Sequence, residues 1–169
     1  TLAIVTVLRG VVCNLPAAFW LEMDCYRLFL DLGAAPQPGV RPDINPLGHV
    51  DALCLTHSHI DHAASLDCWA QIGSPPVYAT EQTRLQLGNV DVPMYALRSL
   101  PPRGQSAIGP PNLLPARRGH SPGSVWVHLP AAGRFTYLGA SSRLAPLLPF
   151  ACPPQVQPPA PDAPHGHRP

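Results

Sequence analysis

Three histidines and one aspartate lie within the seven-residue segment Thr56-His57-Ser58-His59-Ile60-Asp61-His62. Imidazole nitrogens and a carboxylate oxygen are donors that zinc accepts together, and such groups are costly to bury side by side unless something binds them. The segment follows an apolar run at 50–55, so His57 and His59, two positions apart, should point to the same side of an extended strand end. The alternative is a solvated loop that is rich in histidine by accident. The spacing favours a metal site.

The pattern H-x-H-x-D-H after a hydrophobic strand resembles the signature of the metallo-β-lactamase-fold metallohydrolases. The segment Leu28-Phe29-Leu30-Asp31-Leu32-Gly33 resembles the strand and D-x-G turn that precede this signature. The segment Gly119-His120-Ser121-Pro122-Gly123-Ser124 resembles the later segment that supplies one more metal-binding histidine. The run Pro76-Val77-Tyr78-Ala79-Thr80, followed by Thr83, is similar to the β-CASP branch, whose best-known members are RNA and DNA nucleases.

The resemblance implies an α/β fold, namely the αββα sandwich of that superfamily, with its first half present and part of its second. Residues 1–150 are expected to form this incomplete domain. Residues 151–169 contain seven prolines and almost no periodic apolar pattern, so they are expected to form an extended or disordered tail.

By resemblance, a first metal site would take three histidines as ligands: His57, His59 and His120. A second site would take Asp61 and His62. In the family a bridging aspartate follows a glycine at a strand end, but here Ala140 stands at the matching position, and a methyl group offers no ligand atom. We therefore expect one tightly bound zinc ion and a second that is weak or absent.

Several of these residues have an alternative role. Asp61 could bind a second metal, act as the general base for a metal-bound water, or simply cap a helix. Asp31 could orient a ligating imidazole by hydrogen bonding, or it could only form the turn before Gly33. His120 on its glycine-flanked loop could be solvated instead of ligating, and His62 loses part of its expected role if the second site is weak.

The remaining histidines are not expected to bind metal. His49 follows directly on a proline-rich loop at 34–48, and His128 lies on an alternating strand on the same side as Trp126, so both are predicted to be surface residues. His165 and His167 lie in the tail, which would make them poor ligand donors.

The apolar pattern predicts strands separated by glycine, proline and asparagine. They are expected at 2–8, 17–23, 26–32, 50–55, 124–129 and 134–138. One helix is expected from Asp61, capped by this aspartate and ended by Gly73; a second should run from the cap Thr80 to Leu87 and stop at Gly88.

Composition narrows the function only partly. Ten acidic residues nearly balance eleven basic ones, so net charge argues neither for nor against a nucleic-acid partner. No apolar run is long enough to span a membrane, the start does not read as a signal peptide, and five cysteines without a C-x-x-C pair fit a reduced, cytoplasmic setting. The oligomeric state is open.

These features together predict a zinc-dependent hydrolase that uses a metal-activated water, with a phosphodiester, as in RNA or DNA, as the first substrate to consider. The substrate could equally be a small molecule. The phosphate-binding candidates between 88 and 118 are four arginines: Arg98, Arg103, Arg117 and Arg118. The alternative is a catalytically impaired metal-binding or scaffold domain of the same fold, which Ala140 would favour.

Overall fold

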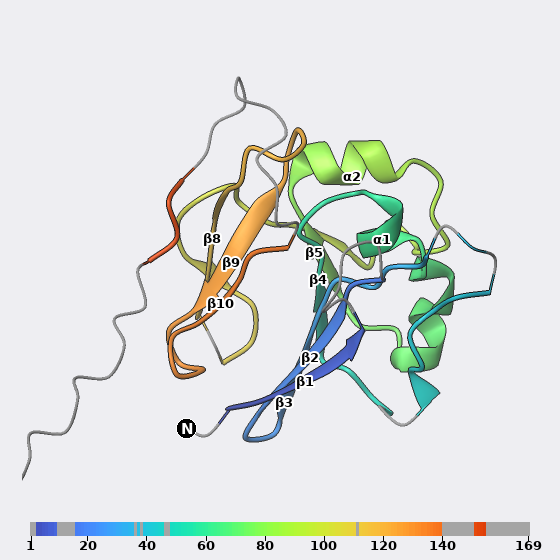
Figure 1. Cartoon of the computed structure of the whole chain (residues 1–169), viewed down its shortest axis with the longest axis horizontal. Coiled ribbons are helices and arrows are strands. Elements are labelled where there is room, and N and C mark those ends of the chain that lie inside the picture. Colours follow the sequence, from blue (N-terminus) through green and yellow to red (C-terminus); the bar gives the residue numbers. More distant parts are fainter. Residues whose placement is uncertain are drawn as a thin grey trace, which may run out of the picture.

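The structure is a computed structural model that describes residues 3–9, 16–35, 37, 39–45, 48–110, 112–139 and 151–154. In these residues two sheets pack face to face, and helices cover the other face of the larger one (Figure 1). The expected α/β class is therefore confirmed. None of the helices in these segments is long and apolar enough to cross a bilayer.

The larger sheet has six strands in sequence order: β1 (Ala3–Arg9), β2 (Ala18–Met23), β3 (Tyr26–Leu30), β4 (Ala52–Cys54), β5 (Val77–Ala79) and β6 (Leu97–Ser99). The first three pair antiparallel as hairpins, and β3 to β6 run parallel. The carboxyl ends of β3, β4 and β5 therefore meet at one edge of the sheet, where loops can converge.

The smaller sheet is antiparallel, in the order β10 (Phe135–Tyr137), β9 (Val125–Leu129), β8 (Asn112–Arg117) and β7 (Ser106–Ala107). Alternation along β3 shows how the layers are built. Leu28 and Leu30 face the second sheet and pack with Val127, whereas Phe29 faces the helix layer and packs with Trp69. Because every side chain of β3 from Leu28 onward is buried, this strand holds a fixed position beneath the site.

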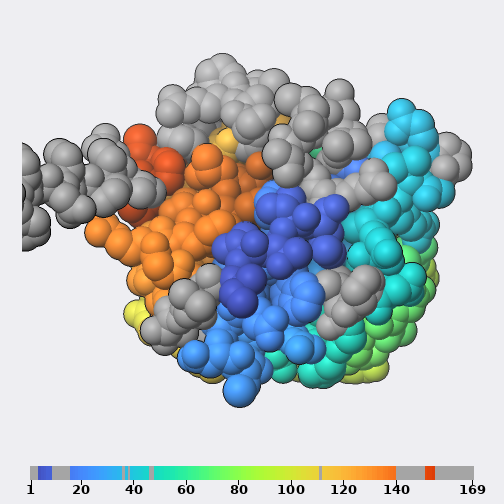
Figure 2. All heavy atoms as spheres, turned by 60° about the horizontal axis from the view of Figure 1, so that its bottom comes forward, coloured from blue at the N-terminus to red at the C-terminus, as the bar shows by residue number. Residues whose placement is uncertain are grey.

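The strand predicted at 26–32 ends two residues early, at Leu30. Asp31 has a φ of 59°, which an extended strand does not allow, so the chain turns away from the sheet there. The edge strand β1 lies on the surface, where Ile4, Val5 and Val7 are exposed (Figure 2).

The helix expected from Asp61 is two elements, α1 (Ile60–Ala63) and the 3₁₀ helix η2 (Leu66–Ile72). The helix breaks because the Ser65 N–H donates to Leu32 O at 2.9 Å rather than to a helical carbonyl. Asp61 lies in the first turn, and the N-cap position is occupied by His59, so the capping role predicted for Asp61 is wrong. The end at Gly73, with φ 91°, is confirmed.

The second helix, α2 (Glu81–Leu87), agrees with its prediction. Thr80 is its N-cap and accepts a hydrogen bond from Thr83 N at 3.3 Å, and Gly88 follows its last turn. The short strands β5, β6, β7 and β8 were not predicted, since each has few apolar residues or carries proline, as β8 does at Pro115.

Candidate metal centre

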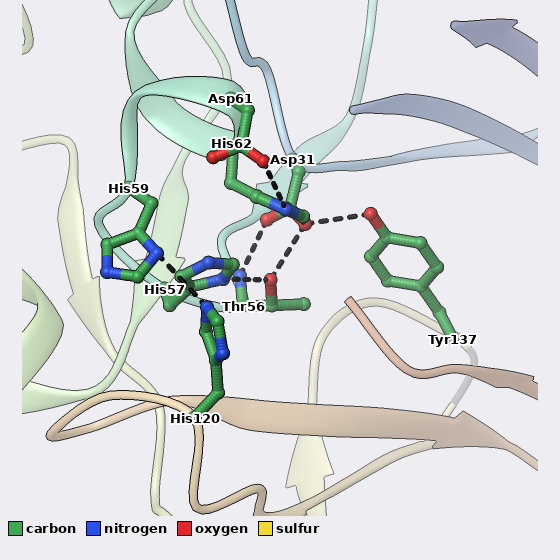
Figure 3. Close-up of polar contacts among 8 residues, drawn as sticks. All are labelled: Asp31, Thr56, His57, His59, Asp61, His62, His120 and Tyr137. Atoms are coloured by element: carbon green, nitrogen blue, oxygen red, sulfur yellow. Dashed lines mark hydrogen bonds and ion pairs between the residues drawn. The ribbon is translucent and has the colours of Figure 1, made fainter. Parts of the chain in front are cut away.

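The histidine-rich segment leaves the sheet at the end of β4. Leu55 N still donates to Tyr78 O at 2.8 Å, and Thr56 O accepts Val125 N of the second sheet at 3.0 Å. Thr56 is therefore held between the two sheets, and the residues that follow it project from the carboxyl ends of the parallel strands (Figures 1 and 3).

The turn after β3 cradles helix α1. Leu32 N donates to His62 O at 2.8 Å, and Ala34 N donates to Ile60 O at 3.0 Å. Gly33 lies between them, so close to α1 that a Cβ atom added there would be 1.8 Å from Asp61 O. The glycine of the D-x-G turn is thus needed for close packing, and this packing sets the position of Asp61 and His62.

We expect Gly33→Ala to shift or unfold α1 and to lower the free energy of unfolding by about 3 kcal/mol, the upper end of overpacking costs, because the added carbon would meet backbone and not a movable side chain. Urea unfolding of the purified variant measures this. Gly104→Ala is the control: Gly104 has a φ of 93°, and no described atom lies within 4 Å of the added Cβ, so only the backbone cost of about 1 kcal/mol is expected. A smaller loss at Gly33 than at Gly104 would contradict the packing argument.

His120 is positioned by a tight loop that α2 holds. Ser124 Oγ accepts hydrogen bonds from the N–H groups of His120 and Ser121, at 3.2 and 3.1 Å. The buried hydroxyls of Thr80 and Thr83 both donate to Gly123 O, at 2.7 and 3.3 Å. The two threonines of the β-CASP-like run thus hold the His120 loop in place.

A bridge from α2 joins the two histidine loops. Gln86 accepts a hydrogen bond from Ser58 Oγ at 2.6 Å and donates one to Pro122 O at 3.1 Å. Ser58 lies between His57 and His59, and Pro122 lies just after His120. Segments about sixty residues apart in the sequence are thereby brought to one place.

The structure brings the five predicted site residues into two overlapping groups whose ligand atoms lie within 4.8 Å of one another: His57, His59 and His120, and His57, Asp61 and His62. His57 belongs to both. Its ring lies 4.7, 4.0 and 4.9 Å from the rings of His59, His62 and His120, centroid to centroid. Figure 3 shows His57 in the middle of the cluster.

A buried carboxylate stands behind these imidazoles. Asp31 has no exposed surface, and it accepts four hydrogen bonds: from Thr56 N, Thr56 Oγ1 and His62 Nδ1 at 2.7 Å each, and from Tyr137 Oη at 2.9 Å. The two roles considered for Asp31 both apply, because it makes the turn and also orients a site imidazole.

Hydrogen counting along this network assigns the protons of two rings. Thr56 has one hydroxyl hydrogen and gives it to Asp31, so at 3.0 Å it accepts the Nδ1–H of His57. His62 donates its Nδ1–H to the same carboxylate. When neutral, both rings therefore carry the proton on Nδ1, which leaves Nε2 with a free lone pair.

The electrostatics act in opposite directions on the two rings that lie next to Asp31, His57 and His62. Burial, and then the charges of His62, His120 and His59, lower the pKa of His57 to about 3 against the opposing effect of Asp31, so this ring is neutral near pH 7. Burial would raise the pKa of Asp31, but the charge and hydrogen bond of His62 outweigh it and the pKa is lowered. Burial would lower the pKa of His62, yet Asp31 raises it.

The neutral form of His57 gives a pH prediction for the metal-free chain. The unfolded chain takes up a proton at this ring below about pH 6.5, whereas the folded chain does so only near pH 3, so folding stability falls as the pH drops through this window. Between pH 6.5 and 5 we expect a loss of about 1.5 kcal/mol from this group. The raised pKa of His62 acts above pH 6.5, where it lowers stability as the pH rises.

Urea unfolding in the presence of a chelator tests this prediction. The loss between pH 6.5 and 5 should be smaller by that amount in His57→Asn, whereas His49→Asn, at an exposed position outside the cluster, should keep the full loss. Equal slopes in all three proteins would show that His57 does not carry the effect.

The donor set fits a divalent metal. His57 Nε2 is buried and has no hydrogen-bond partner in the part of the chain that the structure describes, an arrangement that costs free energy unless a ligand occupies that lone pair. His120 Nε2 and His59 Nδ1 are 3.1 Å apart, near the roughly 3.3 Å that separates two nitrogens bound at about 2.0–2.1 Å in a tetrahedral site. The first group could thus hold one metal through three nitrogens, and Asp61 with His62 could contribute to a second.

Two further histidines, His49 and His128, were predicted to lie on the surface. His49 is exposed, as predicted, and lies 3.5 Å from Asp51. The surface position predicted for His128 is wrong: all five residues of β9 are buried, and His128 Nδ1 lies 2.7 Å from Thr136 Oγ1. On the same strand, the indole N–H of Trp126 donates to the carbonyl of Ala151.

The position of Ala140 lies outside the described residues, as do residues 155–169 of the predicted tail. Thr56 and Tyr137 were missed as members of the site. Thr56 begins the histidine segment, and its polar side chain after a buried strand was a signal that could have been used. Tyr137 gave none, since a tyrosine in an apolar strand reads as a core residue.

Comparison with known proteins bears on this geometry. A family model described as the metallo-beta-lactamase superfamily matches residues 45–134, which includes every residue of the two groups. No curated protein matches the chain.

Solved structures share the fold. Rm3 metallo-beta-lactamase is 22% identical with a TM-score of 0.55, over 74% of this chain and 55% of its own. A metallo-beta-lactamase of Cronobacter sakazakii is 21% identical with a TM-score of 0.57, over 79% and 55%. A diphosphatase from the PhnP family is 19% identical with a TM-score of 0.56, over 75% and 62%. The chain spans less than two thirds of the length of each of these structures.

Proposed function

Because the chain belongs to the metallo-β-lactamase superfamily, we propose that it is a metal-dependent hydrolase, with zinc as the metal and a phosphodiester as the substrate. The observation that carries the proposal is the convergence of two ligand groups on His57, whose buried Nε2 has no hydrogen-bond partner among the described residues. Composition alone would not favour a hydrolase over any other metal-binding domain; the partly exposed donor set, with Asp61 beside it, supports the hydrolase.

A divalent metal held there would supply a water nucleophile near neutral pH and would polarise the group under attack. The residues of this chain do the remaining work. His57, His59 and His120 would hold the metal, and Asp31 with Thr56 would keep the Nε2 of His57 turned toward it.

Asp61 is the candidate general base. Its side chain is 41% exposed, and Oδ2 lies 3.5 Å from His62 Nε2. The carboxylate is thus open to solvent on one side and fixed on the other by the packing of α1 on Gly33. In this position it can accept a proton from a water molecule at Oδ2 or share a metal with His62.

Two observations favour a phosphodiester as the substrate. A diphosphatase is among the proteins that share the fold, and the run at 76–80 resembles the β-CASP branch. Of the four arginines considered for phosphate binding, Arg98, Arg103 and Arg117 are exposed, but Arg118 is buried at 6% exposure. Three exposed arginines fit a small phosphodiester better than a long nucleic acid, which would need a continuous basic surface.

A catalytically impaired domain is the second candidate, and Ala140 favours it. At this position the family carries an aspartate that bridges two metals, so by resemblance the second metal would be held by Asp61 and His62 with too few ligands. We propose accordingly that one zinc binds tightly and a second weakly or not at all.

The experiment compares the chain with Ala140→Asp in the hydrolysis of bis(p-nitrophenyl) phosphate, after chelation and reloading with zinc. Measurable zinc-dependent hydrolysis that rises at least about tenfold in Ala140→Asp supports a hydrolase with a weakened second site. Zinc binding without hydrolysis by either protein would reject the hydrolase and favour the scaffold. A nitrocefin assay in parallel shows whether a β-lactam is a better substrate.

A further inference from the structure

Tyr137 reaches the site from the second sheet. Its hydroxyl donates to Asp31 Oδ2 at 2.9 Å, across 106 positions of sequence, and the residue is buried at 7% exposure. The other three hydrogen bonds to Asp31 come from Thr56 and His62, on the segment that follows β4. Among the residues that the structure describes, Tyr137 is the one residue of the smaller sheet that hydrogen-bonds to the Asp31 carboxylate (Figure 3).

The two carboxylate oxygen atoms of Asp31 accept different numbers of hydrogen bonds from the described residues. Oδ1 accepts one hydrogen bond, from Thr56 N, whereas Oδ2 accepts three, from Thr56 Oγ1, His62 Nδ1 and Tyr137. A buried carboxylate needs such donors to stay ionised. The Tyr137 hydroxyl donates to the same oxygen atom as Thr56 Oγ1 and His62 Nδ1. A displacement of this oxygen atom would therefore change the hydrogen bonds that orient both His57 and His62.

The hydroxyl itself is held firmly. The Tyr137 ring packs on Phe19 with centroids 4.7 Å apart and planes inclined at 52°, and the residue pairs with Val127 in the sheet. Two residues later, Gly139 lies so close to Thr56 that an added Cβ would be 2.8 Å from Thr56 Oγ1. The end of β10 thus contacts the Asp31–Thr56 pair at two points.

We propose that Tyr137 is a positioning residue for the metal ligands: its hydroxyl fixes Asp31 so that His62 directly, and His57 through Thr56, present Nε2 toward the metal. The inference rests on the proposed metal site. It gives the smaller sheet a second part in metal binding besides the loop that carries His120. Strand β10 holds Asp31 in place through Tyr137, and Asp31 in turn orients His57 and His62.

A core tyrosine whose ring merely packs is the competing explanation, and Tyr137→Phe separates the two. This variant keeps the contact with Phe19 and removes one oxygen. Tyr26→Phe is the matched control, since Tyr26 packs against the same core cluster but makes none of the contacts with Asp31. Zinc affinity is measured by competition with a chromogenic chelator, and cobalt-loaded protein gives a ligand-field absorption spectrum.

We expect Tyr137→Phe to weaken the tightest zinc by about tenfold, the lower end of outer-shell effects, and to change the cobalt spectrum, with Tyr26→Phe unchanged. In an Asp31→Asn background the same substitution should have no further effect on affinity, because the hydroxyl acts through that carboxylate. Unchanged affinity and spectrum in Tyr137→Phe, or a full additional loss in the Asp31→Asn background, would overturn the inference while leaving the metal site intact. Absence of zinc binding by the unchanged chain would overturn the proposed function together with it.

Discussion

Replacing His57 with asparagine is expected to abolish tight metal binding. His57 is the one residue shared by both ligand groups, so its loss leaves two donors in each. Loss of an outer-shell partner alone typically costs about 10–100-fold in metal affinity, and loss of a direct ligand should cost at least about 100-fold. Isothermal titration of the chelator-treated variant with zinc measures the effect.

The matched comparison is His120→Asn, which removes a ligand from the first group only. It should also weaken the tightest site, but it should leave His57, Asp61 and His62 able to retain a metal weakly. His49→Asn serves as the control for loss of an exposed imidazole and should bind as the unchanged chain does. An affinity for His57→Asn within about threefold of the unchanged chain would mean that His57 is not a ligand.

The second large effect is expected from Asp31→Asn. Asparagine has nearly the same shape as aspartate, but its amide replaces one carboxylate oxygen with an NH₂ group, which cannot accept. Four hydrogen bonds are now donated to the Asp31 carboxylate. Removing one partner of a buried charged pair typically costs about 3–5 kcal/mol, so we expect a loss near 3 kcal/mol in the free energy of unfolding at pH 7. Urea unfolding of metal-free protein gives this value without any contribution from a bound ion.

The pH dependence of this loss follows from the lowered pKa of Asp31. Stability from a carboxyl of lowered pKa is present above its unfolded value of about 3.9 and is lost as the pH falls through the folded value. The difference between the two proteins should therefore be full at neutral pH and shrink only in strong acid. Asp67→Asn, which removes an exposed pair with Arg41, should cost less than about 1 kcal/mol; a similar loss at both positions would contradict the argument.

The elements that could be predicted from the sequence are those that local residue patterns determine. The hairpin strands and α2 could be recognised because apolar alternation and a threonine cap act over a few residues. The length of the first helix could not, because Ser65 bonds to Leu32, a residue more than thirty positions away. The burial of His128 depends likewise on the opposing strand, where Thr136 Oγ1 contacts its Nδ1.

The site shows the same division. Local patterns predicted five site residues. The close spacing of histidine and aspartate indicated His57, His59, Asp61 and His62, and the flanking glycine indicated His120. Tyr137 could not be found this way, because its role exists only when two sheets pack and bring its hydroxyl to Asp31. Thr56 lay in the motif, but its function depends on tertiary contacts. Its hydroxyl donates to Asp31 and therefore accepts from His57 Nδ1.

The central claim is that the histidine cluster holds one metal tightly, and the metal content of the purified chain tests it most directly. Elemental analysis after dialysis against zinc and then against metal-free buffer should give close to one zinc per chain, and none in His57→Asn. A zinc content near zero in the unchanged chain would contradict the metal site itself. Two zinc ions retained per chain with Ala140 in place would contradict the proposed weak second site.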